Sequence, residues 1–108
     1  MKDVLQALLI AGETMRDDVF DGIKCISIRE GHRKYIVGKP IILCCHRLNW
    51  ATMREVTEVM HVTLKDVSSD DYQADGFSTQ GEMLDGLRKF YPNVDLDSPV
   101  TVIKWKKA

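Results

Sequence analysis

The sequence predicts an α+β fold, a small mixed β-barrel with two or three short flanking helices. Four apolar segments, alternating or continuous, are typical of strands: 25–29, 41–46, 54–63 and 99–106. Two further segments, 14–21 and 78–91, place apolar side chains at helical spacing. A barrel is the natural way for several short strands to hide their edges.

Length and composition predict a single domain that spans residues 1–108. The chain is 44% apolar and 29% charged, close to the average of globular domains. The net charge of −1 argues against a protein that coats long nucleic acid by bulk charge. It still allows a local basic patch.

The cysteines are three in number, Cys25, Cys44 and Cys45, and have no CxxC spacing. A disulfide framework is therefore not expected, and a reducing compartment fits better. The apolar run Leu8–Ala11 is too short for a signal peptide or a membrane span. We expect a cytoplasmic protein without membrane association. The sequence does not predict the oligomeric state.

Neither a metal nor a cofactor is predicted. The histidines, His32, His46 and His61, lack the paired spacing of metal ligands. Phosphate-binding and dinucleotide-binding motifs are also missing from the sequence. Trp50, in an expected connection over 47–53, and Trp105 are interpreted as packing residues, although a loop tryptophan could also stack on a ligand.

The expected helices have recognisable ends. Thr14 is a candidate N-cap for 14–21, and Gly22 ends that helix. Ser78 or Thr79 caps 78–91, with Glu82 placed as in a capping box. A capped helical turn is expected at 68–71. Residues 4–11 could form a helix or a buried strand. In strand 54–63 neither face is cleanly apolar, so the sequence does not predict which of its two faces is buried.

The first candidate site is Gly22–Arg29. Strand alternation puts Ser27 and Arg29 on the face opposite Ile26 and Ile28. A lysine near a hydroxyl can act in nucleophilic catalysis, and an arginine can hold a phosphate in bidentate fashion. Lys24 can reach Ser27 only if it lies in the turn before the regular strand. The alternative is a strand with an ordinary solvated face.

Two further segments could join such a site. The loop Gly31–Tyr35 carries three potential cations and an aromatic ring that could bind phosphate and stack on a base; these are His32, Arg33, Lys34 and Tyr35. Asp75 precedes the second helix and could orient a lysine or transfer a proton. The alternatives are a solvated loop and a helix start in which Phe77 is a hydrophobic staple.

Three segments together resemble the ASCH domain family of the PUA-like superfamily. They are Met15–Gly22 running into Lys24 and Ile26–Arg29, then Tyr35–Pro40, and then Asp75–Ser78 followed by Glu82, Met83, Leu84, Leu87 and Tyr91-Pro92. Each motif is short, and their order and spacing carry the resemblance over about Leu5 to Trp105. The resemblance implies a β-barrel with a cleft beside the first motif, and RNA or a modified nucleoside as the ligand.

One group within that family, the N(4)-acetylcytidine amidohydrolases, uses a lysine, a threonine and a glutamate. By motif, Lys24 matches the lysine, Ser27 falls at the threonine, and Asp75 falls at the glutamate with a shorter reach. Other members are described as RNA-binding or ribonucleolytic. We therefore carry three hypotheses: an RNA- or nucleotide-binding domain first, a hydrolase of acylated pyrimidine nucleosides second, and a protein-interaction domain without a ligand third.

Overall fold

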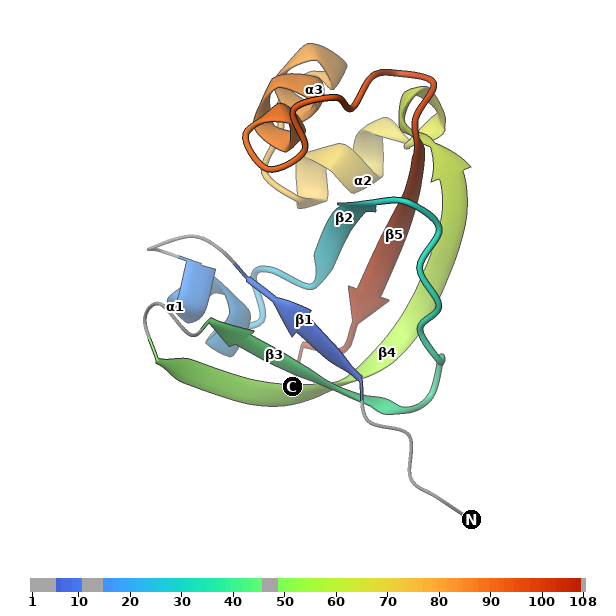
Figure 1. The fold of residues 1–108 in the computed structure, drawn as a ribbon. Coiled ribbons are helices and arrows are strands. Elements are labelled where there is room, and N and C mark those ends of the chain that lie inside the picture. Colours follow the sequence, from blue (N-terminus) through green and yellow to red (C-terminus); the bar gives the residue numbers. More distant parts are fainter. Residues whose placement is uncertain (1–5, 11–14, 46–48, 108) are drawn as a thin grey trace.

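The computed structural model describes residues 6–10, 15–45 and 49–107. Its strands are β1 (Ala7–Leu9), β2 (Ile26–Glu30), β3 (Pro40–Cys45), β4 (Trp50–Thr63) and β5 (Pro99–Trp105). Its helices are α1 (Met15–Phe20), α2 (Ser69–Ala74) and α3 (Gln80–Arg88), with a 3-10 turn at Leu64–Asp66. The predicted class is confirmed: the fold is α+β, with short helices beside a mixed sheet (Figure 1).

The sheet is a curled half-barrel with strand order β1-β3-β4-β5-β2. Strand β1 pairs with β3 in parallel, and all other neighbours are antiparallel. The long strand β4 pairs with β3 through its first half and with β5 through its second half, so it links the two parts of the sheet (Figure 1). The ambiguous segment 4–11 therefore contains a strand.

Two apolar clusters lie against the sheet. One contains Ile41, Leu43 and Trp105, together with Val19 of α1. The other contains Ile26 and Ile28 of β2, packed with Met83 and Leu87 of α3. Both faces of β5 are buried, since its residues alternate between the clusters. Burial of this apolar surface is the main force that holds the helices against the strands.

Strand β4 differs from the prediction at its start and in its phase. The expected connection 47–53 is strand from Trp50 onward, and Trp50 is a buried core residue next to Phe20 instead of a loop residue. The pairing with β5 shifts between Val56 and Glu58. Such a β-bulge moves the following side chains to the other face. A single alternation therefore cannot describe this strand.

The helix ends follow their sequence signals. Thr79 caps α3, because its Oγ1 accepts a hydrogen bond from the Glu82 backbone N–H at 3.1 Å. Glu82 in turn accepts the backbone N–H of Ser78, the residue before the cap, at 2.7 Å, so the reciprocal bond of the expected capping box is shifted by one residue. Ser68 caps α2 in the same way. The expected cap Thr14 and the residue His46 lie outside the described residues. Along the described chain, no helix is long and apolar enough to cross a membrane.

Candidate ligand-binding site

Lys24 lies in the turn that joins α1 to β2, outside the regular strand. Gly22 makes this turn with a φ of 75°, a conformation that glycine adopts without strain. The Asp18 carbonyl then accepts the backbone N–H groups of Ile23 and Lys24 at 2.8 and 2.9 Å. The Trp105 indole N–H donates to the Lys24 carbonyl at 3.1 Å. The backbone at Lys24 is thus held on both sides.

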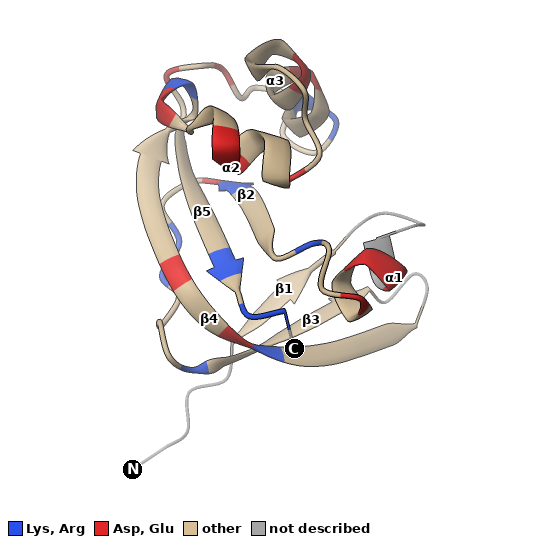
Figure 2. Cartoon of the chain, turned by 180° about the vertical axis from the view of Figure 1, so that it is seen from behind, with Lys and Arg blue, Asp and Glu red and all other residues tan. Residues whose placement is uncertain are grey.

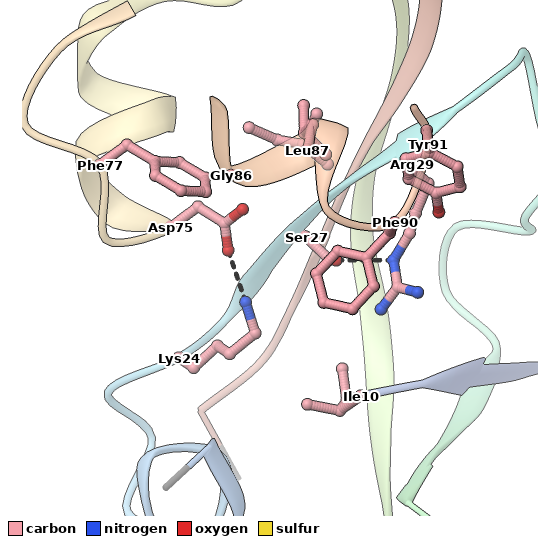
Figure 3. A pocket seen from close by; sticks show the side chains of 11 residues that line it. Ile10, Lys24, Ser27, Arg29, Asp75, Phe77, Gly86, Leu87, Phe90 and Tyr91 are labelled. Carbon is pink, nitrogen blue, oxygen red and sulfur yellow. Dashed lines mark hydrogen bonds and ion pairs between the residues drawn. The ribbon is translucent and has the colours of Figure 1, made fainter. Parts of the chain in front are cut away.

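The Lys24 side chain points to Asp75, 51 residues later in the chain (Figure 3). Its Nζ donates to the Asp75 Oδ1 at 2.5 Å and to the Ile26 carbonyl at 2.8 Å. Both side chains are about nine-tenths buried, with exposed fractions of 10% and 9%. The two groups form a buried ion pair, which is uncommon unless the charges are paired and hydrogen-bonded.

Asp75 follows α2 and leads into the turn at Gly76, whose φ is 100°. Burial raises the pKa of the Asp75 carboxyl, and the charges of Lys24 and Arg29 offset this only in part. The carboxyl group is therefore less acidic than a solvated aspartate, although a lysine contacts it directly. A raised pKa beside a paired cation is a frequent feature of functional sites.

Ser27 and Arg29 form the second polar group of the site. The Arg29 Nε donates to the Ser27 Oγ at 2.8 Å (Figure 3). Its Nη2 donates to the Leu9 carbonyl at 2.5 Å. Arg29 thereby connects β2 to β1, the two edge strands of the half-barrel. Ser27 is buried, so its face is not the solvated one that the strand pattern allowed.

These four side chains line one cavity of about 130 Å³ between β2, α2 and α3 (Figure 3). The rest of its lining is mostly apolar and aromatic: Ile10, Ile28, Phe77, Gly86, Leu87, Phe90 and Tyr91. The cavity thus has charged and hydroxyl groups in one part and aromatic walls in the other. That composition suits a flat ligand with polar atoms on its edge.

The hydrogen bonds divide the three predicted catalytic residues between two contacts, one of which involves the predicted ligand-binding residue Arg29. Lys24 contacts Asp75, and Ser27 contacts Arg29. No hydrogen bond joins Lys24 to Ser27 in the described chain, although both line the cavity. The arrangement offers a cation, a carboxyl group, a hydroxyl group and a guanidinium group to a bound molecule.

The loop residues predicted to bind a ligand lie outside the cavity lining. The Arg33 Nη2 donates to the Oη of Tyr91, a cavity residue, at 3.4 Å. His32 stacks on His61 of β4, with ring centroids 4.9 Å apart. Lys34 is exposed, and Tyr35 packs against the core. Among these residues, Arg33 lies next to the cavity, while none of them lines it.

Sequence reasoning missed part of the cavity wall. Phe90 is 60% exposed at the cavity, while its neighbour Tyr91 packs against the apolar cluster that contains Met83 and Leu87. The helix ends at Arg88, so the helical spacing no longer applies at Phe90. Ile10 and Gly86 carry no signal of a site in the sequence. Within the described ranges, no group of three metal-ligating side chains is present.

Comparison with known proteins gives matches in structure alone. No family model matches the sequence, and no curated protein matches it either. The crystal structure of an ASCH domain from Lactobacillus crispatus JV V101 matches with a TM-score of 0.69 and 15% identity, covering 94% of this chain and 78% of that chain. The chain has an ASCH-like fold.

Further structures agree with this assignment. An ASCH protein from Zymomonas mobilis matches with a TM-score of 0.64 and 10% identity, over 94% of this chain and 65% of that chain. A protein from Enterococcus faecalis V583 matches with a TM-score of 0.69 and 12% identity, over 98% of this chain and 82% of that chain. At these identities the ASCH-like fold is shared, and the activity has to be argued from the site.

Proposed function

We propose that this ASCH-like domain binds a nucleobase, in a nucleotide or in RNA, in the cavity between β2 and α3. One observation carries the proposal: Lys24, Asp75, Ser27 and Arg29 gather on one part of a cavity whose other walls are aromatic and apolar. A base has flat faces that stack on aromatic rings and an edge of hydrogen-bond donors and acceptors. The two parts of the cavity match these two properties.

The size of the cavity supports a single base. Pockets for drug-sized ligands usually measure about 300–1,000 Å³. This cavity, at about 130 Å³, is smaller and would hold one ring-sized group. A protein-interaction domain without a ligand predicts that the Lys24 and Ser27 face is covered and has no pocket. The presence of a cavity there favours a ligand-binding role.

The test is a titration of the protein with the four ribonucleosides, their monophosphates and short single-stranded RNA. Binding is monitored by the NMR chemical shifts of the protein. The expected result is saturable shifts centred on Ser27 and Arg29. Replacement of the exposed ring in Phe90→Ala should weaken binding by about 1–3 kcal/mol, the usual contribution of a base stacked on an aromatic ring. Met53→Ala, which removes an exposed apolar side chain of β4, is the matched control. Absence of shifts at the cavity with every ligand would reject the proposal.

A second candidate function is hydrolysis of the amide of an acylated pyrimidine nucleoside, of the N(4)-acetylcytidine type. The buried contact between Lys24 and Asp75 favours it, because a carboxyl of raised pKa can accept the lysine proton. Lys24, having passed a proton to the Asp75 carboxylate, would then take the proton of Ser27 as the Ser27 oxygen attacks the acyl carbonyl. The exocyclic amine would leave with a proton from Lys24, and water would release the acyl group from Ser27.

Chromatography of N(4)-acetylcytidine incubated with the protein tests this second function. Wild type should release cytidine and acetate, while Lys24→Ala should not. Lys104→Ala is the control, since Lys104 is also ion-paired to an aspartate, Asp71 at 2.8 Å, but lies outside the cavity. Equal inactivity of wild type and Lys24→Ala would exclude the hydrolase for this substrate class.

A further inference from the structure

We infer that the bound base belongs to a nucleotide and that Arg29 and Arg33 bind its phosphate at the mouth of the cavity. The inference rests on the proposed function, because it assumes that a base fills the cavity. It is carried by two arginines: Arg29 lines the cavity, and Arg33 contacts the cavity residue Tyr91. Within the described part of the chain, neither arginine pairs with a carboxylate.

The size of the cavity places everything attached to the base outside it. A space of about 130 Å³ would be filled by the ring, so the sugar and phosphate would emerge among the exposed lining residues. Phe90, at 60% exposure, marks this open side. In the view of Figure 3, the Arg29 guanidinium lies near the rings of Phe90 and Tyr91. A phosphate leaving the cavity there would meet a cation.

Arg33 extends this cationic surface beyond the cavity. Its Nη2 lies 3.4 Å from the Tyr91 Oη, and its Nε donates to the Glu30 carbonyl at 3.0 Å. These contacts involve neutral groups, so the charge of the guanidinium is not compensated by them. A guanidinium can bind two phosphate oxygens at once, and such charge-assisted hydrogen bonds are among the stronger ones in proteins.

The loop holds Arg33 in place before any ligand binds. Thr101 of β5 is fully buried, and its Oγ1 accepts the Arg33 backbone N–H at 2.7 Å. The same hydroxyl donates to the Gly31 carbonyl at 2.7 Å. The His61 Nε2 lies 2.6 Å from the Arg33 carbonyl. This irregular loop is therefore fixed to two strands, which lowers the entropy cost of binding through Arg33.

The overall charge of the protein does not account for an attraction between the cavity mouth and a phosphate. The net charge is −1, and Figure 2 shows acidic and basic residues together on several elements. Asp75 interacts electrostatically with Arg29, but its carboxylate is hydrogen-bonded to Lys24. The attraction for a phosphate must therefore be local to the two arginines. Lys34, next to Arg33, is exposed and has no described contact, so it serves as a control for charge alone.

The experiment is isothermal titration calorimetry at low salt with ribonucleosides, their 5′- and 3′-monophosphates, and inorganic phosphate. Wild type should bind at least one monophosphate about tenfold more tightly than its nucleoside, since one charge-assisted contact contributes at least that factor. Arg33→Gln should reduce this preference, because Arg29 alone would then contact the phosphate. Arg33→Lys should keep part of the preference, and Lys34→Gln should keep all of it.

Equal affinity of wild type for nucleoside and monophosphate would overturn the inference and leave the proposed function standing. A preference that is undiminished in Arg33→Gln would also overturn it. Binding of inorganic phosphate that depends on Arg33, without binding of any nucleoside or nucleotide, would instead overturn the proposed function. Thermal melting of each variant shows whether it is folded, so a loss of binding can be assigned to the site.

Discussion

The Nζ of Lys24 and the Oδ1 of Asp75 lie 2.5 Å apart at the edge of an aromatic-walled cavity. Lys24 comes from the turn before β2, and Asp75 comes from the end of α2. Their contact joins the sheet to the helical layer through a pair of buried charges. The favourable interaction between such charges is opposed by the cost of removing them from water.

The pair should show strong coupling in a double-mutant cycle. Lys24→Met and Asp75→Leu should each destabilise the protein by about 3–5 kcal/mol, because each leaves the other charge buried without a partner. The double variant should be more stable than either single variant. Urea unfolding, monitored by circular dichroism, measures the free energy of unfolding of wild type and of the three variants. Additive effects in the double variant would mean that the two charges do not depend on each other.

The raised pKa of Asp75 predicts a specific dependence of stability on pH. The ordinary pKa of an aspartate is 3.8, and the folded value is higher. Between these two values the folded protein binds more protons than the unfolded chain, so the free energy of unfolding falls as pH rises. Below 3.8 both states are protonated, and above the folded pKa both are ionised. The contribution of Asp75 is therefore most favourable at acidic pH.

Comparison with Asp75→Asn isolates this contribution. The free energy of unfolding of wild type minus that of the variant should fall as pH rises from 3.8 to the folded pKa of Asp75, and it should level off above that value. The Lys24 side chain is present in both proteins, so the difference between them reports on Asp75. A difference that rises with pH would show that the Lys24 charge, and not burial, dominates at this carboxyl.

Much of the fold follows from local sequence signals. The strands β2 and β5 and the Thr79 cap of α3 depend on nearby residues, so a sequence pattern can predict them. The phase of β4 cannot be predicted in this way, because its bulge depends on pairing with β5. The strand also serves two parts of the sheet, each of which buries a different set of its side chains.

The site was only partly predictable for the same reason. Gly22 and Lys24 signal a turn and a cation locally, but their contact with Asp75 spans 51 residues and depends on how α2 packs. The sequence pattern marks Asp75 as a carboxylate that could orient a lysine, and the family resemblance pairs it with Lys24. Phe90 and Ile10 join the cavity only through tertiary packing. Arg33 was expected to face a ligand, and its actual link to the cavity through Tyr91 required the structure.

Two glycines of α3 should respond in opposite ways to alanine. A Cβ at Gly86 would lie 2.5 Å from the Phe77 Cε1, so Gly86→Ala must displace this cavity ring. At Gly81 the nearest atom, the Thr79 Oγ1, would lie 3.9 Å away. Gly81→Ala should stabilise the protein by up to about 1 kcal/mol through helix propensity, without affecting binding. Gly86→Ala should lose this gain to overpacking, which costs about 1–3 kcal/mol.

Binding measurements on the same two variants report on the cavity. Displacement of the Phe77 ring changes an aromatic wall, so Gly86→Ala should bind nucleosides more weakly than wild type, whereas Gly81→Ala should bind them equally well. Thermal melting and calorimetry provide the two measurements. Unchanged affinity in Gly86→Ala would show that Phe77 does not contact the ligand.

The two tryptophans should differ in their response to phenylalanine. Both are buried, but the Trp105 N–H donates to the Lys24 carbonyl, while the Trp50 N–H has no hydrogen-bond partner among the described residues. Trp105→Phe leaves a buried carbonyl without its donor and should cost about 1–3 kcal/mol beyond the loss of ring area. Trp50→Phe removes a donor that is already unpaired, so its cost should be limited to packing. Urea unfolding of the two variants compares these costs directly. A larger loss of stability in Trp50→Phe than in Trp105→Phe would contradict this account.

The Trp105 variant should also bind nucleosides more weakly, because Trp105 holds the backbone of Lys24.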